Sequence, residues 1–361
     1  GHEFGLDPLD DVSIMIESGL VSILPPALLP SHPSHLEFPG PVTPNAPRTE
    51  TNLTFNSNQT GLPREFGPAN PQAMILHSTG LYAPPGEPVT VVVPQELVDS
   101  GVSVQVGVHD DTLWHKSKIW RFPSIVRSYP IAETQFEVGN AFGGPIFLAS
   151  PPDAPLGSTW AEFRGGVEAP IYQHGSTSFS EWQIIRNRSA PWAEISSDQF
   201  IMSVPSSEIR GLDNPEELMD FWVEALEMEH ELYGFIPWPR IERAAFDIQI
   251  SAGWMHSGYP FMAHLVSAQE AVDLEHMESE GSWGMFHELG HNHQWNPSRL
   301  PGTTETTCNF ASVYLMEDLV GLDLGHSALS PQQRHQRMES YFQGGADIDD
   351  WSVWTALDTY L

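Results

Sequence analysis

Cysteine and lysine are almost missing from this sequence. Cys308 is the one cysteine in 361 residues, so the chain has no disulfide framework. Lys116 and Lys118 are the only lysines, and 15 basic residues stand against 47 acidic ones, which gives a formal net charge of −32. A surface this acidic repels phosphate backbones and anionic membranes, so we expect no nucleic-acid partner. The acidity indicates solubility or salt adaptation and does not specify a substrate.

A long hydrophobic run is also missing. The apolar stretch 12–29 is interrupted by Glu17 and by Pro25-Pro26, so it predicts neither a membrane span nor a secretory signal. The first residues, GHEF, are typical of a cloning remnant, and the sequence stops at Leu361 within a helical pattern. We therefore expect an excised piece of a longer protein.

The remaining composition, with 40% hydrophobic residues, is that of a globular protein long enough for two or three domains. We expect an N-terminal helix and linker over 1–37, which includes the cloning remnant. A proline-rich connecting arm without regular structure should follow over 38–75. A β-sandwich is expected over 76–205, and a catalytic domain over 206–361 that is truncated at its C-terminus.

The β-sandwich prediction depends on period-two patterns. Valines at 102, 104, 106 and 108 alternate with Ser, Gln and Gly, which is typical of a half-buried strand. Other short apolar runs, separated by Gly and Pro, predict further strands at 89–93, 119–122, 145–149, 166–172 and 181–185.

Helical periodicity begins near 213, where Leu218, Phe221, Trp222, Ala225 and Leu226 share one face. His230, on the same helix, is expected to be solvated or to cap it. A strand at 241–250 should come next. Further helices are expected at 266–276, 282–294, 303–320, 330–343 and 350–361.

The motif that organises the chain is His287-Glu-Leu-Gly-His291. On a helix, two histidines four residues apart point to one cation, and Glu288 can orient a water held on that cation. Zinc needs a third protein ligand, and Glu305 follows after a loop and at the start of a new helix. These residues predict a zinc site made by His287, His291 and Glu305, with Glu288 as the catalytic base. The bound water would have a lowered pKa, and Glu288 would transfer its proton to the leaving amine.

Other residues near the motif leave alternatives open. Asn309, one turn after Glu305, is expected either to hydrogen-bond the far nitrogen of a ligand histidine or to join two helices. Cys308 is expected to be a buried packing residue, with a thiolate ligand as the alternative. His293 is out of phase with the ligand pair, so we expect it at the cleft edge or in solvent. Trp254, His256 and Tyr259 are candidates for the cleft wall, Trp295 for stacking on a sugar, and Tyr259 or Tyr314 for stabilising the oxyanion.

Several longer stretches carry a resemblance to a known family. They are FPGP at 38–41, TGLYAPPGEP at 79–88, GG at 143–144, APWAE at 190–194, QISAGWMHSGYP at 249–260, HELGHN at 287–292, TTE at 303–305 and WTAL at 354–357. These stretches resemble the enhancin-like, mucin-degrading zinc metallopeptidases, a gluzincin family. Within it, they most resemble the branch of the vertebrate factors associated with a cold-sensing TRP channel.

The resemblance implies an α+β multidomain fold, with a jelly-roll-like β-sandwich packed against a mostly helical zincin-type domain. It implies bound Zn2+ and cleavage of O-glycosylated proteins. Carried over by position, it also implies that His287, His291 and Glu305 are the metal ligands and that Glu288 is the catalytic base. In the channel-associated branch the implied role is instead the binding and trafficking of a membrane protein. The family's helical region also continues beyond Leu361.

Two main functions are consistent with these observations. The first is a zinc endopeptidase that hydrolyses peptide bonds in O-glycosylated, mucin-like proteins outside the cell. The second is a non-catalytic regulatory or interaction module that keeps the zinc site and acts in the cytoplasm beside a membrane protein. The complete set of four active-site residues favours the first. A carbohydrate-binding domain without turnover is the third alternative.

Overall fold

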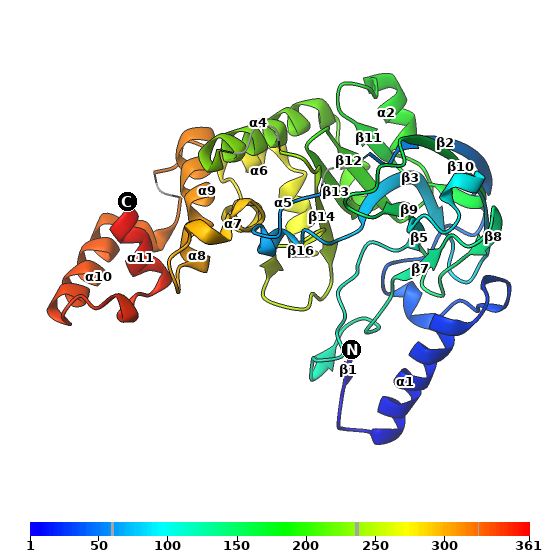
Figure 1. Cartoon of the computed structure of the whole chain (residues 1–361), viewed down its shortest axis with the longest axis horizontal. Helices are drawn as coiled ribbons and strands as arrows, with labels where there is room; N and C mark the ends of the chain where they lie inside the picture. Colours follow the sequence, from blue (N-terminus) through cyan, green and yellow to red (C-terminus); the bar gives the residue numbers. More distant parts are fainter. Residues whose placement is uncertain (59–60, 235–237, 324) are drawn as a thin grey trace.

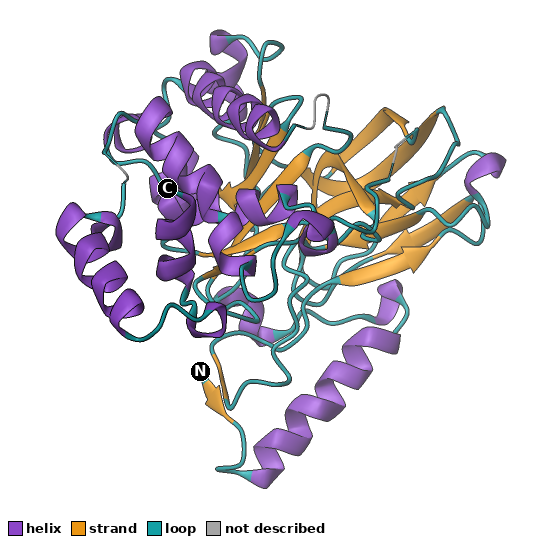
Figure 2. Cartoon of the chain, turned by 60° about the vertical axis from the view of Figure 1, so that its left-hand side comes forward, coloured by secondary structure: helices purple, strands orange, loops and turns teal. Residues whose placement is uncertain are grey.

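The computed structural model describes residues 1–58, 61–234, 238–323 and 325–361 of the chain. The fold is α+β, as the sequence predicted: most strands lie in one half of the molecule and most helices in the other (Figures 1 and 2). Among the described helices, none combines the length and the apolar character needed to cross a membrane.

The N-terminal helix, α1, spans Pro8–Ile23 and begins where the Asp7 side chain accepts a hydrogen bond from the Leu9 N–H. It leans away from the strands (Figure 2). The proline-rich stretch after it was expected to be irregular, but it contains strand β2, Thr49–Asn56. The expectation was wrong because Thr49, Thr51, Leu53 and Phe55 alternate toward the protein, and β10 supplies their hydrogen-bonding partner.

The first sheet is antiparallel and has the order β7-β5-β9-β3-β10-β4-β8, with β2 also paired to β10. A register shift in β10 around Gly165, a residue with φ +102°, lets the start of this strand pair with β4 and its end with β3. The strands on both sides of β10 therefore surround one apolar core, which includes Val91, Val104 and Phe163. The bounds are β3 Ile75–Ala83, β4 Val89–Val92, β5 Ser103–Val106, β7 Arg127–Pro130, β8 Gln135–Val138, β9 Gly144–Ser150 and β10 Ser158–Glu168. The two-residue strands β1 His2–Glu3 and β6 Lys118–Ile119 pair apart from this sheet.

The second sheet is mixed and has the order β11-β12-β13-β14-β16-β15. Its strands are β11 Ile171–Gln173, β12 Trp192–Ser196, β13 Phe200–Pro205, β14 Glu242–Asp247, β15 Met255–His256 and β16 Phe261–His264. Strands β11 to β13 lie in the range that we expected to form the β-sandwich, but they share this sheet with β14, β15 and β16, because β13 pairs with β14. Periodicity shows that a strand is buried, but it does not show which sheet the strand joins.

One expected strand is a helix. Residues 181–185 belong to α2, Phe179–Ile185, because Ser178 and Glu181 form a reciprocal capping box. The Trp182 side chain, which the apolar pattern placed in a strand, is buried from this helix instead.

The predicted helices are present in the predicted order, but those expected at 266–276 and 303–320 are each divided into shorter helices, and the short helix at Ser206–Ile209 was not predicted. The helices from residue 206 onward are α3 Ser206–Ile209, α4 Pro215–Tyr233, α5 Ser267–Ala271, α6 Leu274–Ser279, α7 Trp283–His293, α8 Thr304–Thr307, α9 Asn309–Tyr314, α10 Pro331–Gln343 and α11 Val353–Tyr360, with a π-helical turn at Leu315–Leu319. Short 3₁₀ turns lie at Pro26–Leu28, Pro33–Leu36, Gly67–Ala69, Gln95–Leu97, Asn296–Ser298, Ser327–Leu329 and Ile348–Asp350.

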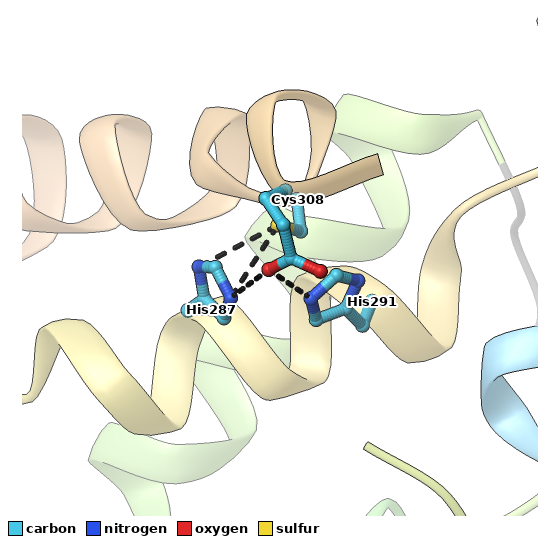
Figure 3. Close-up of side chains that lie close together, drawn as sticks. His287, His291 and Cys308 are labelled. Atoms are coloured by element: carbon cyan, nitrogen blue, oxygen red, sulfur yellow. Dashed lines mark hydrogen bonds and ion pairs between the residues drawn. The ribbon is translucent and has the colours of Figure 1, made fainter. Parts of the chain in front are cut away.

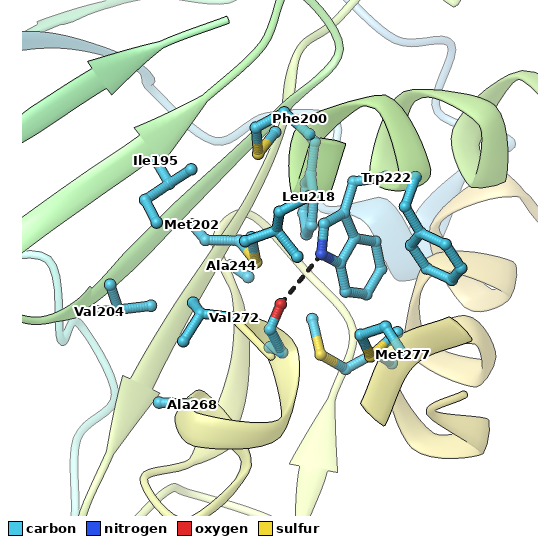
Figure 4. Close-up of a cluster of buried hydrophobic side chains, with 14 of the residues drawn as sticks. Ile195, Phe200, Met202, Val204, Leu218, Trp222, Ala244, Ala268, Val272 and Met277 are labelled. Atoms are coloured by element: carbon cyan, nitrogen blue, oxygen red, sulfur yellow. Dashed lines mark hydrogen bonds between the residues drawn. The ribbon is translucent and has the colours of Figure 1, made fainter. Parts of the chain in front are cut away.

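The largest core holds α4, α7 and the second sheet together. Trp222 of α4 packs against Leu218, Phe200 and Met277, and its indole N–H donates to the Ala271 carbonyl at 3.1 Å (Figure 4). This packing fixes one face of α7 against the protein. The opposite face of α7 is left to carry the candidate site.

Candidate metal centre

Helix α7 presents His287 and His291 side by side, with ring centroids 4.6 Å apart. The helix begins at Ser282, whose hydroxyl accepts the Met285 N–H. The short helix α8 brings Glu305 over the pair, so that its Oε2 lies 3.3 Å from His287 Nε2 and 3.2 Å from His291 Nε2 (Figure 3). The three residues that the sequence suggested as ligands therefore meet at one point.

Gly290, between the two histidines, lets the next helices approach α7 closely. A Cβ at this position would lie 2.4 Å from the Cys308 carbonyl oxygen and 3.0 Å from the Ala311 Cβ. A backbone atom cannot move aside as a flexible side chain can. The absence of a side chain at Gly290 thus allows the close packing that places Glu305 beside the two histidines.

Replacing Gly290 with Ala should lower the free energy of unfolding by roughly 1–3 kcal/mol through overpacking, and should weaken zinc binding. Gly284→Ala in the same helix is the matched control, because its Cβ would meet only the flexible Met255 thioether. Urea denaturation and zinc titration of both variants measure the effect. Equal behaviour of the two variants would contradict this account of Gly290.

The far nitrogens of both histidines are held by amide side chains. His287 Nδ1 donates to Asn309 Oδ1 at 2.6 Å, and His291 Nδ1 donates to Gln294 Oε1 at 3.0 Å. Gln294 is itself fixed, because its amide N–H groups donate to Thr304 O and Thr307 Oγ1. These bonds orient both rings so that each Nε2 faces Glu305. Sequence reasoning suggested Asn309 but missed Gln294, whose only signal was its place three residues after His291.

The donor set fits a zinc ion. Tetrahedral zinc with nitrogen and oxygen ligands at about 2.0–2.1 Å keeps neighbouring donor atoms roughly 3.3 Å apart. The measured separations of 3.3 and 3.2 Å agree with that spacing. Hydrogen bonds from His287 and His291 hold the pKa of Glu305 far below its usual range, so Glu305 is ionised, as a metal ligand must be.

Glu288 is buried beside this cluster, with 7% of its surface exposed. Burial raises the pKa of its carboxyl group, while the positive charges of His287 and His291 act in the opposite direction. Within the described part of the chain, its carboxylate has no hydrogen-bond donor. It is free to exchange a proton with a molecule bound at the centre.

A second histidine with a carboxylate partner lies near Glu288. His256 Nε2 donates to Asp111 Oδ2 at 2.9 Å, and its Nδ1 donates to the Ser257 carbonyl at 3.0 Å. Burial opposes protonation of His256, but these bonds outweigh it and raise its pKa, and its charge acts on Glu288. Asp111 and His256 line a pocket of about 370 Å³. The sequence indicated His256 as a candidate for the cleft wall, but no local pattern points to Asp111, which lies 145 positions earlier in the chain.

The residues suggested for substrate contact divide into two groups. Trp254 and Trp295 are exposed, and Tyr314 is half-buried on α9. Tyr259 is buried instead, and its hydroxyl accepts the Leu76 N–H of β3 at 3.4 Å. Tyr259 also lines the same pocket as His256, so its role in stabilising an oxyanion stays a prediction.

Two further expectations about histidines were wrong. His293 and His230 are both buried, not solvated, because the back of α7 packs on α4. His293 Nδ1 lies 2.7 Å from Glu229 Oε2. Burial raises the pKa of Glu229 and lowers that of His293, which favours the uncharged form of each side chain.

Cys308 is fully buried, as expected, but it faces the site. Its Sγ lies 3.5 Å from Nδ1 and 3.6 Å from Nε2 of His287 (Figure 3). Burial raises the pKa of the thiol. The ligand atoms of His287, His291, Glu305 and Cys308 all lie within 4.8 Å of one another.

Comparison with known families agrees with this geometry. A family model described as peptidase M60, enhancin and enhancin-like, matches residues 165–361. The chain belongs to the M60 peptidase family. A second model, the N-terminal domain of M60-like peptidases, matches residues 45–159 of this M60 chain.

Among curated relatives, TRPM8 channel-associated factor 2 of Bos taurus is 40% identical over 302 residues, which cover 82% of the M60 chain and 33% of the relative. The chain thus spans about a third of that protein's length. Two solved structures share the fold. A protein of unknown function from Bacillus anthracis has TM-score 0.68 at 16% identity, covering 86% of this chain and 63% of that one. IMPa of Pseudomonas aeruginosa, in complex with an O-glycopeptide, has TM-score 0.56 at 15% identity, covering 84% and 37%.

Proposed function

We propose that the chain is a zinc-dependent endopeptidase that cleaves O-glycosylated proteins. The single observation that carries the proposal is the convergence of both histidine Nε2 atoms on Glu305 beside the unpaired Glu288 carboxylate. The M60 family match supports peptidase chemistry. The O-glycopeptide bound to the structurally similar IMPa supports the substrate class.

His287, His291 and Glu305 would hold the metal, and Asn309 and Gln294 would keep the two imidazole rings oriented. A zinc ion bound there supplies Lewis acidity and lowers the pKa of water. Glu288 accepts a proton from the attacking water and delivers it to the nitrogen of the leaving amine. Protonated His256, held by Asp111, would place positive charge near the Glu288 carboxylate, and the bond to Asp111 raises the pKa of His256 and so favours that form. Trp254 and Trp295 offer exposed rings on which a sugar can stack.

An interaction module that keeps the zinc site is the second candidate function. The names of the curated relatives, which are channel-associated factors, favour it. In that case the partner would be a membrane protein. Glu288 would then be an unused residue beside a structural metal.

Liquid chromatography with mass spectrometry, applied to one mucin-type peptide in O-glycosylated and unglycosylated forms, tests the proposal. With one equivalent of zinc, the chain should cut the glycosylated peptide next to a modified Ser or Thr and leave the unglycosylated peptide intact. Addition of a chelator should stop cleavage, and zinc should restore it. Two intact peptides in the presence of zinc-loaded protein would favour the interaction module.

A further inference from the structure

Cys308 belongs to the four-residue cluster, although peptide hydrolysis needs only His287, His291 and Glu305 as metal ligands. It follows Glu305 by three residues, so both side chains leave the same side of consecutive helical turns. Its backbone is pressed against α7, because the Cys308 carbonyl occupies the space that a Gly290 side chain would need. The chain therefore places this sulfur at the metal centre through the same close contact that assembles the ligands.

The distance from Cys308 Sγ to His287 Nε2 is compatible with a sulfur ligand. Zinc binds thiolate at about 2.3 Å, so a sulfur and a nitrogen on one tetrahedral zinc stand roughly 3.6 Å apart. The separation of Cys308 Sγ from His287 Nε2 is 3.6 Å. The sulfur is also 3.5 Å from Nδ1 of His287, so it lies beside the imidazole ring. A rotation about the Cα–Cβ bond of Cys308 is needed to bring the sulfur to the Nε2 side of the ring.

Alternative roles for this sulfur are few. Disulfide formation within the chain is excluded, because there is no second cysteine. The residue is fully buried. Its nearest polar neighbours are the nitrogens of a residue that we assign to the metal.

We propose that Cys308 is a fourth protein ligand that closes the metal centre. In the closed form the S–H proton is lost to solvent, a sulfur–zinc bond forms, and the zinc–water bond breaks. A closed four-ligand set of this kind is typical of structural zinc sites, whereas catalytic sites keep one position for water. The chain would be an M60 peptidase held in a latent state by its own cysteine, and rotation of Cys308 away from the metal would open it. The inference rests on the metal centre of the proposed function.

X-ray absorption at the zinc edge tests the proposal without any substrate. The parent chain loaded with one zinc should show one sulfur neighbour at about 2.3 Å, and Cys308→Ala should show only nitrogen and oxygen neighbours. Cobalt substitution offers a second reading, because a thiolate-to-cobalt charge-transfer absorption should be present in the parent and absent in the variant. Cys308→Ser, which keeps the side-chain volume, controls for repacking of the buried site.

The outcomes separate this inference from the proposed function. Zinc bound through nitrogen and oxygen alone in the parent would overturn the role of Cys308 and leave the endopeptidase proposal standing. A sulfur neighbour in the parent, with glycopeptide cleavage at least several-fold faster in Cys308→Ala, would support both. A sulfur neighbour without cleavage by parent or variant would support the ligand and contradict the endopeptidase. A parent chain that binds no zinc would overturn both.

Discussion

Replacing Glu288 with Gln is expected to slow glycopeptide cleavage by roughly 100- to 10,000-fold, the range that a positioned general base contributes. The amide keeps the size of the side chain but cannot accept the proton of the attacking water. Zinc binding should be unchanged, because the ligand atoms belong to His287, His291 and Glu305. The effect should therefore lie in kcat, with little change in KM.

The control for this variant is Glu278→Gln, a change to an exposed carboxylate on α6. It should cleave at the parental rate. If Glu288→Gln retained more than a tenth of the parental kcat at full zinc occupancy, Glu288 would not be the base.

Loss of the Arg243 guanidinium is expected to destabilise the chain by roughly 3–5 kcal/mol, because it would leave a buried charge without its partner. Arg243, on β14, is fully buried and is paired with Glu194 on β12. It also donates to Ser78 Oγ at 2.8 Å and to the Leu76 carbonyl at 3.2 Å, both on β3 of the first sheet. One side chain thus connects the two sheets. Urea denaturation of Arg243→Met measures the loss.

The double variant Arg243→Met, Glu194→Gln is the matched comparison. It removes both charges, so it should recover much of the stability that the single change loses. A single variant as stable as the parent would show that this ion pair does not hold the two sheets together.

The sequence was sufficient to predict that His287, His291 and Glu305 converge, because the information for this cluster is local. The spacing of His287 and His291 follows from helical geometry, and Glu305 needed only a loop of suitable length. The valine alternation likewise predicted β5. The order of helices from α4 to α11 followed from their apolar periodicity.

The missed features depend on contacts between distant parts of the chain. Strand β2 is stabilised by β10, about a hundred residues later in the chain, and no local sequence pattern predicts this pairing. His293 looked solvated because α7 was considered alone, whereas α4 covers its rear face. The Asp111–His256 pair joins a loop of the first sheet to β15 of the second. Helix α2 is the exception. Its capping box was visible in the sequence, but the prediction followed the apolar run and assigned a strand.

Native mass spectrometry of the zinc-loaded chain tests the metal centre most directly. The parent should retain one zinc ion per chain, and the His287→Ala, His291→Ala double variant should retain none while keeping its folded charge-state distribution. Glu288→Gln, measured beside them, should bind zinc as the parent does. A folded parent that takes up no zinc, or a double variant that still binds one ion, would contradict the metal centre and with it the proposed hydrolysis.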